Sequence, residues 1–466
     1  MNKTVAFVSL TAGLALTALV LGLPHVAPPH PATPVPPSTP ATASNGSLTM
    51  TSRLSHPYIT PGSSDLFVTV DVTGVEVPGS KRTPVNLAVV IDRSGSMSGY
   101  KLQQAKQAAR HLVGLLGPED RLAIVHYGSD VKSLPGLPAS PSNRERMLQY
   151  IEGIWDDGGT NIGAGLHTGR SLVAAVRGDY TVNRIILLSD GQATEGITDD
   201  ASLTEVVKGI RTEGITVSAI GVGTDFNEDL MQGFAEYGAG AYGFLEDAGQ
   251  LASLFQKDLR QASTSVARNV ELTFQLPEGV MLGEVLGYRA HQEGRTVRVP
   301  LPDFSSGQVE RVVARVTVVG TRAGNAVDVT GLKLAYADLL KGTGVESAAS
   351  LSAMVTERRE EVLARQDKDA TVYATRAMSA KNLKMAAQAL RDGRKEEAKG
   401  YVMQNQALFQ QAGAVASPAA VAADLEEQRA VLQEYEQASD DESVGAAVKR
   451  TKSKAMKSFG KLGSTY

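Results

Sequence analysis

Two spacings of apolar residues divide this chain into regions. Around Asp65 the stretch DLFVTVDVTGVEV alternates apolar and polar residues, which is the pattern of a strand with one buried face. Residues 85–92, VNLAVVID, form a continuous apolar run instead. The next segment has an amphipathic spacing, with one face made of Leu102, Ala105, Ala109, Leu112 and Leu116. The pattern predicts a half-buried strand, then a strand buried on both sides, then an amphipathic helix.

Strands and helices then alternate as far as residue 263. Further strands are predicted in DRLAIVHYGS, NRIILLSDG, TVSAIGVG and GAYGFLED. Helices are predicted in SNRERMLQYIEGI, in NIGAGLHTGRSLVAAV, near Leu203 to Arg211, near Leu230, and from Gly249 to about Gln261. This order is typical of a mostly parallel sheet covered by helices on both faces. Ligands of such sheets bind beyond the carboxyl ends of the strands.

The rest of the chain has a different organisation. Period-two alternation returns beyond Ala267 and predicts a β-sandwich over residues 264–356, which the strands of residues 47–82 join. The predicted fold class is therefore α/β, a doubly wound mostly parallel sheet over residues 83–263, inserted in a β-sandwich. Residues 357–440 are expected to form a helical hairpin or bundle, in which Gly393 separates two amphipathic helices.

The two ends of the chain have unusual compositions. Residues 1–23 place Lys3 before an uncharged apolar stretch and are expected to be a signal sequence or an N-terminal membrane anchor. Residues 24–46 read as a Pro-rich linker. Either interpretation places the remainder outside the cytoplasm, anchored if the segment is uncleaved, or secreted or periplasmic after cleavage. Residues 441–466 form a basic tail, which suits a solvated end or a contact with anionic lipid, cell-wall polymer or an acidic partner.

Composition and motifs exclude several classes of function. Lys and Arg number 46 against 50 Asp and Glu, so no basic field indicates nucleic acid. The absence of Cys excludes thiolate zinc sites and cysteine nucleophiles. The GAGAYG stretch precedes a strand instead of following one, and GQATEGIT has Ile197 where a P-loop needs Lys. No nucleophile elbow or zinc helix is present, so the chain is not expected to be an enzyme. A metal-dependent hydrolase is the remaining enzymatic alternative.

Oxygen-bearing side chains gather where predicted strands end or helices begin. The first buried strand runs into Asp-x-Ser-x-Ser, DDGGTNIG follows a helix, and LLSDGQ closes another strand. Because these ends share one edge of a parallel sheet, their carboxylates and hydroxyls are expected to converge, as a hard cation prefers. The candidate metal ligands are Asp92, Ser94, Ser96, Thr160 and Asp190. The alternative without a ligand is that these residues only cap helices and form turns.

The stretch from about Val85 to Gln261 resembles a von Willebrand factor type A (VWA) domain with a metal-ion-dependent adhesion site. The resemblance implies that Ser94, Ser96 and Thr160 contact Mg²⁺ or Mn²⁺, with Ca²⁺ as a further candidate. It also implies that Asp92 and Asp190 act largely through bound water. The order of parts is loosely similar to inter-alpha-trypsin inhibitor heavy chains.

A partner follows from the charge of such a site. Neutral hydroxyls leave the cation's charge poorly compensated, so an open coordination position would attract a carboxylate. We therefore expect a tethered extracytoplasmic binding protein whose metal captures an acidic residue of a protein partner. The alternative is an accessory component of a membrane or envelope complex, with the metal site as a conformational switch. Trp155, just before DDGGT, is expected to pack in the core, with an exposed recognition surface as the alternative. The sequence leaves the oligomeric state open.

Overall fold

The computed structural model describes residues 40–77, 83–223, 226–245 and 264–459. The chain divides into two units at Val35 and Pro36, and all described residues belong to the second unit. The expected N-terminal segment and most of the Pro-rich linker therefore lie outside the described residues. None of the described helices combines the length and apolar character that crossing a bilayer requires.

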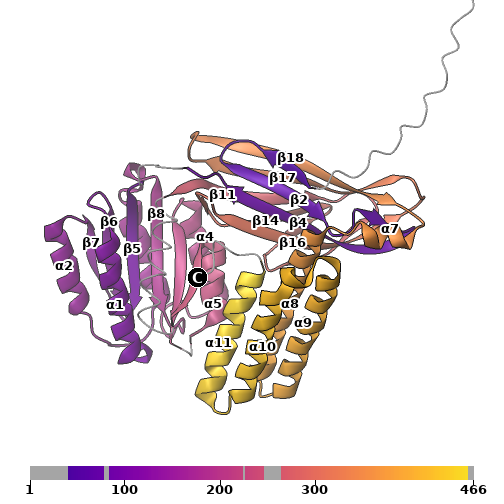
Figure 1. Ribbon diagram of the computed structural model, residues 1–466. Helices are drawn as coiled ribbons and strands as arrows, with labels where there is room; N and C mark the ends of the chain where they lie inside the picture. Colours follow the sequence, from indigo (N-terminus) through magenta and orange to yellow (C-terminus); the bar gives the residue numbers. More distant parts are fainter. Residues whose placement is uncertain (1–39, 78–82, 224–225, 246–263, 460–466) are drawn as a thin grey trace, which may run out of the picture. The chain divides into compact units, whose positions relative to one another are not determined.

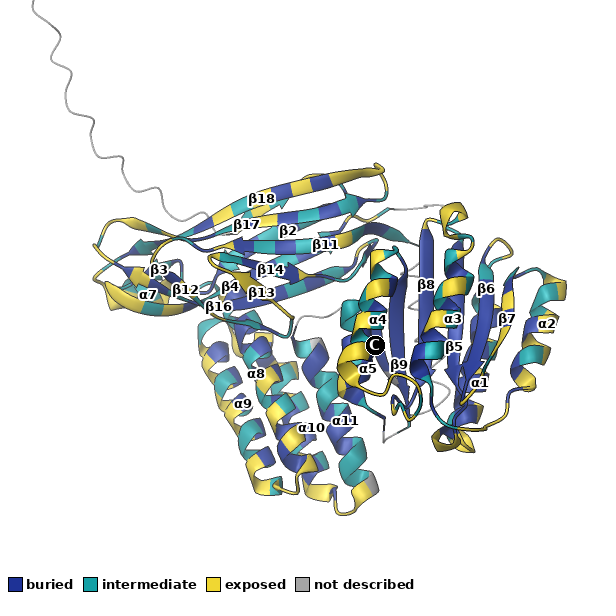
Figure 2. Cartoon of the chain, turned by 180° about the vertical axis from the view of Figure 1, so that it is seen from behind, coloured by how far each residue is buried: buried dark blue, intermediate teal, exposed yellow. Residues whose placement is uncertain are grey.

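A buried, mostly parallel sheet forms the α/β part (Figure 1). Its order over the described residues is β10-β9-β8-β5-β6-β7. The bounds are β5 (Val85–Asp92), β6 (Arg121–Tyr127), β7 (Val131–Pro138), β8 (Val182–Ser189), β9 (Thr216–Val222) and β10 (Ala239–Leu245). Every residue of β5, β8 and β9 is buried, as Figure 2 shows, which confirms the predicted central strands. β7 was not predicted; it pairs antiparallel with β6 at the sheet's edge.

Helices cover both faces of this sheet, as predicted. They are α1 (Tyr100–Leu115), α2 (Pro141–Glu152), α3 (Ile162–Ala174), α4 (Asp200–Thr212) and α5 (Glu228–Tyr237). Successive residues of β5 point to opposite faces, so Val89 packs in a core with α1 and α2, whereas Val90 packs in a core with α3, α4 and α5. The helix expected from Gly249 to about Gln261 lies outside the described residues.

The β-sandwich is built from strands on both sides of the α/β part, which confirms the predicted insertion. One sheet has the order β1-β2-β4-β16-β12 and the other β13-β14-β11-β17-β18-β3, with β15 paired to β11. β4 (Gly62–Gly74) pairs antiparallel with β16 (Val309–Gly320), so strands far apart in sequence are neighbours. The other bounds are β1 (Ala41–Ser44), β2 (Leu48–Leu54), β3 (Tyr58–Ile59), β11 (Ser265–Gln275), β12 (Val280–Leu286), β13 (His291–Glu293), β14 (Thr296–Pro300), β15 (Phe304–Ser305), β17 (Ala326–Asp338) and β18 (Thr343–Val355).

The C-terminal region is helical and packs on the sandwich. Its helices are α7 (Arg359–Ala364), α8 (Lys368–Arg391), α9 (Lys395–Val415), α10 (Ala422–Gln437) and α11 (Asp441–Ser458). Gly393 has a φ of 76° between α8 and α9, the conformation that glycine tolerates best, so the predicted break is confirmed. The solvated, disordered tail expected from residue 441 is wrong for Asp441–Ser458, because α11 buries Ala447, Val448 and Ala455 against neighbouring helices.

Candidate metal centre

The candidate site begins at the carboxyl end of β5, where Asp92 is fully buried. Its Oδ1 accepts a hydrogen bond from the Ser94 backbone N–H at 2.9 Å. Its Oδ2 accepts from the Ser189 hydroxyl at 2.6 Å and from the Tyr127 hydroxyl at 3.2 Å. These donors come from the ends of β8 and β6, the two strands that flank β5. Parallel pairing with β6 and β8 therefore fixes the Asp92 carboxylate at the sheet edge that the sequence predicts.

Ser94 and Ser96 lie on the turn that follows β5. Residues Gly95–Met97 form a short 3-10 turn, and the Met97 N–H donates to the Ser94 carbonyl at 2.9 Å. The turn brings the two hydroxyl oxygens 3.0 Å apart. Ser94 is buried and Ser96 is exposed, so this pair of oxygens connects the buried carboxylates to the surface.

Asp190 follows β8 and is also buried, with 1 % of its surface exposed. Its Oδ2 lies 3.5 Å from the Lys101 ammonium, and its Oδ1 is buried without a hydrogen-bond partner among the described residues. Buried carboxylate oxygens are rarely left unpaired, because desolvation without a replacement bond is costly. The orphaned oxygen therefore indicates a place where a ligand is expected.

Thr160 is brought to this edge through backbone contacts. The Gly158 carbonyl accepts from the Gly95 N–H at 3.1 Å, which joins the loop before α3 to the serine turn. The Thr160 N–H donates to the Thr194 hydroxyl at 2.9 Å, and the Thr160 carbonyl accepts from the Thr194 N–H. Gly158 has a φ of 78°, and a Cβ there would lie 2.7 Å from the Ser129 hydroxyl, so the loop needs glycine at this position. All three loops of the predicted site thus meet.

Burial gives the site an unusual electrostatic character. The pKa of Asp92 is raised to about 6, mainly by desolvation and to a smaller extent by the neighbouring charge of Asp190, while hydrogen bonds from Ser189 and Ser94 oppose the rise. Burial and the Asp92 charge also hold the pKa of the Tyr127 hydroxyl well above its usual range. Two carboxylates held close together away from water favour the approach of a cation.

The donor set fits a hard cation. Carboxylates and hydroxyls offer oxygen alone, which suits Mg²⁺, Mn²⁺ or Ca²⁺ better than a softer metal. Among the described residues no group of three or more His, Asp or Glu side chains is placed to hold a metal, so this site differs from a carboxylate-rich cage. Ser94, Ser96 and Thr160 would supply hydroxyl ligands, while Asp92 and Asp190 would supply negative charge.

Sequence reasoning missed several residues around the site. Ser189 and Tyr127 orient Asp92, and their positions at strand ends beside Asp92 were the available signal. The Arg93 guanidinium is buried, forms an ion pair with Asp130 and donates to the Asp157 carbonyl at 3.1 Å, so it ties the surrounding loops together. Asn161, next to Thr160 in the chain, caps α3 by accepting from the Ala164 N–H.

Trp155 corrects another expectation. It is 69 % exposed, so the prediction that it packs in the core is wrong. The neighbouring Ile154 fills the core position instead and leaves the indole outside. Because Asp157 donates its N–H to the Arg93 carbonyl, Trp155 lies on a loop that is bonded to the site.

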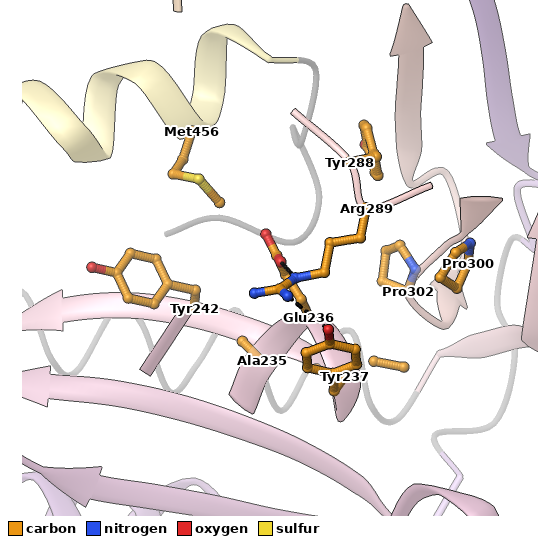
Figure 3. Close-up of a pocket in the computed structure, with 11 residues that line it drawn as sticks. Ala235, Glu236, Tyr237, Tyr242, Tyr288, Arg289, Pro300, Pro302 and Met456 are labelled. Carbon is orange, nitrogen blue, oxygen red and sulfur yellow. Dashed lines mark hydrogen bonds and ion pairs between the residues drawn. The ribbon is translucent and has the colours of Figure 1, made fainter. Parts of the chain in front are cut away.

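A separate cavity carries no comparable chemistry. It has a volume of about 60 Å³. Figure 3 shows the Arg289 side chain crossing it toward Glu236 and Tyr237, with Pro300, Pro302 and Met456 nearby. The guanidinium donates to the Glu236 carboxylate at 2.8 Å and to the Tyr237 hydroxyl at 2.6 Å. The space is equivalent to roughly two water molecules. No predicted site residue lines it, so we do not assign it a ligand.

Comparisons with known proteins agree with this fold. Residues 86–257 match the family model of the von Willebrand factor type A domain. The Escherichia coli K12 protein YfbK, described as uncharacterized, is 29 % identical over 54 % of this chain and 45 % of its own length. The inter-alpha-trypsin inhibitor heavy chain H1 of Mesocricetus auratus is 30 % identical over 32 % of this chain and 17 % of its own. The chain thus spans about half of YfbK and much less of the heavy chain.

Two solved structures have the same fold over most of the chain. A von Willebrand factor type A protein from Catenulispora acidiphila gives a TM-score of 0.65 at 16 % identity, covering 89 % of this chain and 97 % of that one. The ArnB paralog VWA2 from Sulfolobus acidocaldarius gives 0.56 at 18 % identity, covering 89 % and 99 %. The family match thus shows a von Willebrand factor type A domain over residues 86–257.

Proposed function

We propose that this chain is an extracytoplasmic binding protein, and not an enzyme, whose VWA domain holds Mg²⁺ or Mn²⁺ and captures an acidic residue of a protein partner. The observation that carries this proposal is the orphaned, buried Oδ1 of Asp190 beside the buried Asp92 and the paired hydroxyls of Ser94 and Ser96. A divalent cation would satisfy these oxygens together.

The partner's carboxylate follows from where the site opens. Ser96 is exposed, whereas Asp92, Ser94 and Asp190 are buried, so an ion held among them would meet solvent on the Ser96 side. A carboxylate arriving there would complete the coordination and neutralise charge that the hydroxyls leave uncompensated. The exposed Trp155, on a loop bonded to the site, would add apolar contact area for the same partner.

The uncharged stretch of residues 4–23 and the Pro-rich residues 24–46 support the cellular location. The first would export or anchor the chain, and the second would hold the VWA domain away from the membrane.

Metal binding is tested with Asp190→Asn in the full chain, stripped with EDTA and titrated with MgCl₂. The wild type is expected to gain thermal stability on titration, because a ligand that binds only the folded state stabilises it. Asp190→Asn is expected to lose about 10- to 100-fold in Mg²⁺ affinity, as for other residues that support a metal through water. Asp156→Asn, which removes the same charge from an exposed loop position, is the matched control and should respond like the wild type.

Partner capture is tested with the same three proteins. Immobilised wild type and Asp156→Asn should retain proteins in MgCl₂ and release them in EDTA, whereas Asp190→Asn should retain none of these. A wild type that shows no response to Mg²⁺ or Mn²⁺ would rule out the proposal.

A second candidate is favoured by one specific contact. Asn227 donates its N–H to the Asp190 carbonyl at 2.8 Å, and the adjacent Glu228 pairs with Arg391 at 2.8 Å and Lys452 at 2.5 Å. Glu228, which pairs with the C-terminal helices, therefore directly follows Asn227, which is hydrogen-bonded to the site residue Asp190. In this alternative the chain is an accessory component of an envelope complex, its helices bind partners, and the metal site acts as a switch. Partners that stay bound in EDTA but are lost with Glu228→Gln would favour it.

A further inference from the structure

Lys101 is the cation that pairs with the candidate metal centre, and the proposed function assigns it no role. It is the second residue of α1, its side chain is 19 % exposed, and its ammonium lies 3.5 Å from Asp190 Oδ2. Arg93, the residue after Asp92, is engaged differently, because its guanidinium pairs with Asp130 and Asp157 on the surrounding loops.

The position of Lys101 on its helix is unfavourable by itself. The first turn of α1 contains this Lys and no acidic residue, and Gly99 provides no side-chain cap. Backbone N–H groups make a helix N-terminus positive, so a cation there is disfavoured. The buried Asp190 carboxylate compensates this repulsion, which links the placement of Lys101 to the site and not to the helix.

A divalent cation would change this balance. It would lie near Asp190, where the ammonium now supplies positive charge, and two like charges within a few ångströms repel strongly in a partly buried site. We propose, on the basis of the proposed function, that Lys101 is an internal counter-ion of the metal-free site. Its ammonium competes with the divalent cation and thereby lowers the affinity of the site for the metal. When the metal enters, the flexible side chain moves toward solvent, which its partial exposure permits.

This role predicts effects of opposite sign, which a structural ion pair does not. Removing the Lys101 charge should destabilise the metal-free protein, because Asp92 and Asp190 lose a compensating cation. The same change should strengthen Mg²⁺ binding, because the metal no longer has to displace a charge. A residue that only stabilises the fold would lower stability equally with and without the metal.

The test uses Lys101→Met, which keeps the length of the side chain and removes its charge. Lys132→Met is the matched control, because it removes the same charge from the domain. The Lys132 ammonium forms an exposed ion pair with Asp130 at 3.5 Å. Each full-length variant is melted in EDTA and titrated with MgCl₂ by calorimetry. For Lys101→Met we expect a lower melting temperature in EDTA and Mg²⁺ affinity about three- to ten-fold tighter, a range reduced by solvent screening of the ammonium.

Lys132→Met should change neither quantity beyond the small effect of an exposed pair. Lys101→Arg, which keeps the charge, should behave like the wild type in both measurements. If Lys101→Met does not fold, Lys101→Gln replaces it with the same expectation.

The outcomes separate the two proposals. Unchanged or weaker Mg²⁺ binding by the neutral Lys101 variant, with normal binding by the wild type, overturns the counter-ion role and leaves the metal site standing. No Mg²⁺ binding by the wild type overturns the proposed function and this inference with it.

Discussion

Single residues at the site are held in states that cost stability. Asp92 is fully buried, and its pKa of about 6 reflects the price of that burial together with the nearby charge of Asp190. Three neutral hydrogen bonds offset part of the cost without supplying a positive charge. Buried carboxylates in such pairs are more common at functional sites than elsewhere in a fold. Their arrangement is therefore better explained by a ligand than by stability.

A second buried group near this edge, His126 on β6, gives a pH-dependent prediction. The pKa of this imidazole is lowered from 6.5 to about 4, mainly by burial and also by the charges of Arg93 and Lys132, while Asp130 opposes the change. The unfolded chain therefore takes up a proton between pH 6.5 and 4 that the folded chain does not, so folding stability should fall as the pH falls through this range. His126→Phe, which keeps the aromatic contact with Tyr150, should show a smaller loss of melting temperature from pH 7 to pH 5.

His167 provides the control for this experiment. It is exposed on α3, so His167→Gln should keep the wild-type pH dependence. All melts are made in EDTA, which removes any contribution from the metal. Equal losses of stability in the wild type and His126→Phe would contradict the assignment of the neutral, buried imidazole.

At the scale of elements, α5 and α11 are joined by a buried cluster of charges. Glu228 at the start of α5 is 5 % exposed and pairs with Lys452 of α11 and Arg391 of α8. Lys449 of α11 donates to the Phe226 carbonyl at 3.0 Å and lies over the Phe226 ring. Basic residues that the sequence suggested for a solvated tail are therefore used to attach the helix.

Glu228→Gln should reveal the value of this cluster. It leaves Arg391 and Lys452 without their anionic partner. Breaking a buried ion pair in this way costs several kcal/mol. We expect a loss of about 3 kcal/mol in the free energy of unfolding, at the low end because Arg391 is partly exposed. Chemical denaturation measures it.

The adjacent Asp229 is the matched control for that variant. Its side chain is 86 % exposed and lies 4.0 Å from Lys452, so Asp229→Asn should cost less than about 1 kcal/mol. Similar losses for Asp229→Asn and Glu228→Gln would show that net charge, and not the buried cluster, supports α11.

The elements that the sequence predicted and those that it did not differ in the strength of their patterns. β5 and β8 are continuous apolar runs that end in Asp92 and Ser189, so both the strands and the site at their ends could be predicted. Only two residues of β7 are buried, and it contains Pro135 and Gly136, so its local sequence resembles a loop and only pairing with β6 makes it a strand. Lys101 was missed because its role depends on Asp190, 89 residues away.

At the scale of the whole described unit, the α/β part and the sandwich keep separate apolar cores. The sandwich core draws on β2, β4, β11 and β16, and none of its buried residues belongs to the α/β sheet. Contacts between the two parts include ion pairs such as Arg211 with Asp303 at 2.5 Å and Arg289 with Glu236 at 2.8 Å. Polar contacts of this kind contribute less to stability than shared apolar burial.

The ends of the insertion also lie close together. The Val77 N–H donates to the Ser306 hydroxyl at 2.9 Å, and the Ser306 N–H donates to the Thr264 carbonyl at 2.9 Å. Ser306 is therefore hydrogen-bonded both to the residue where the chain leaves the sandwich and to the residue where it returns. Domains inserted at such closely spaced ends can be removed without stretching the host, since a short flexible linker spans the gap.

Replacing residues 78–263 by a linker of about six Gly and Ser residues should therefore leave a folded sandwich with its helices. We expect cooperative thermal unfolding and a circular dichroism spectrum with both helix and strand, at a lower melting temperature than the full chain, because Arg391 and Lys452 lose Glu228. Adding Lys452→Met to the shortened protein should recover part of that loss, since it removes a cation left without a partner, whereas in the full chain the same substitution should destabilise. A shortened protein that unfolds without cooperativity would show that the sandwich depends on the VWA domain for its fold. The polar contacts between the two parts would then contribute more to stability than exposed ion pairs usually do.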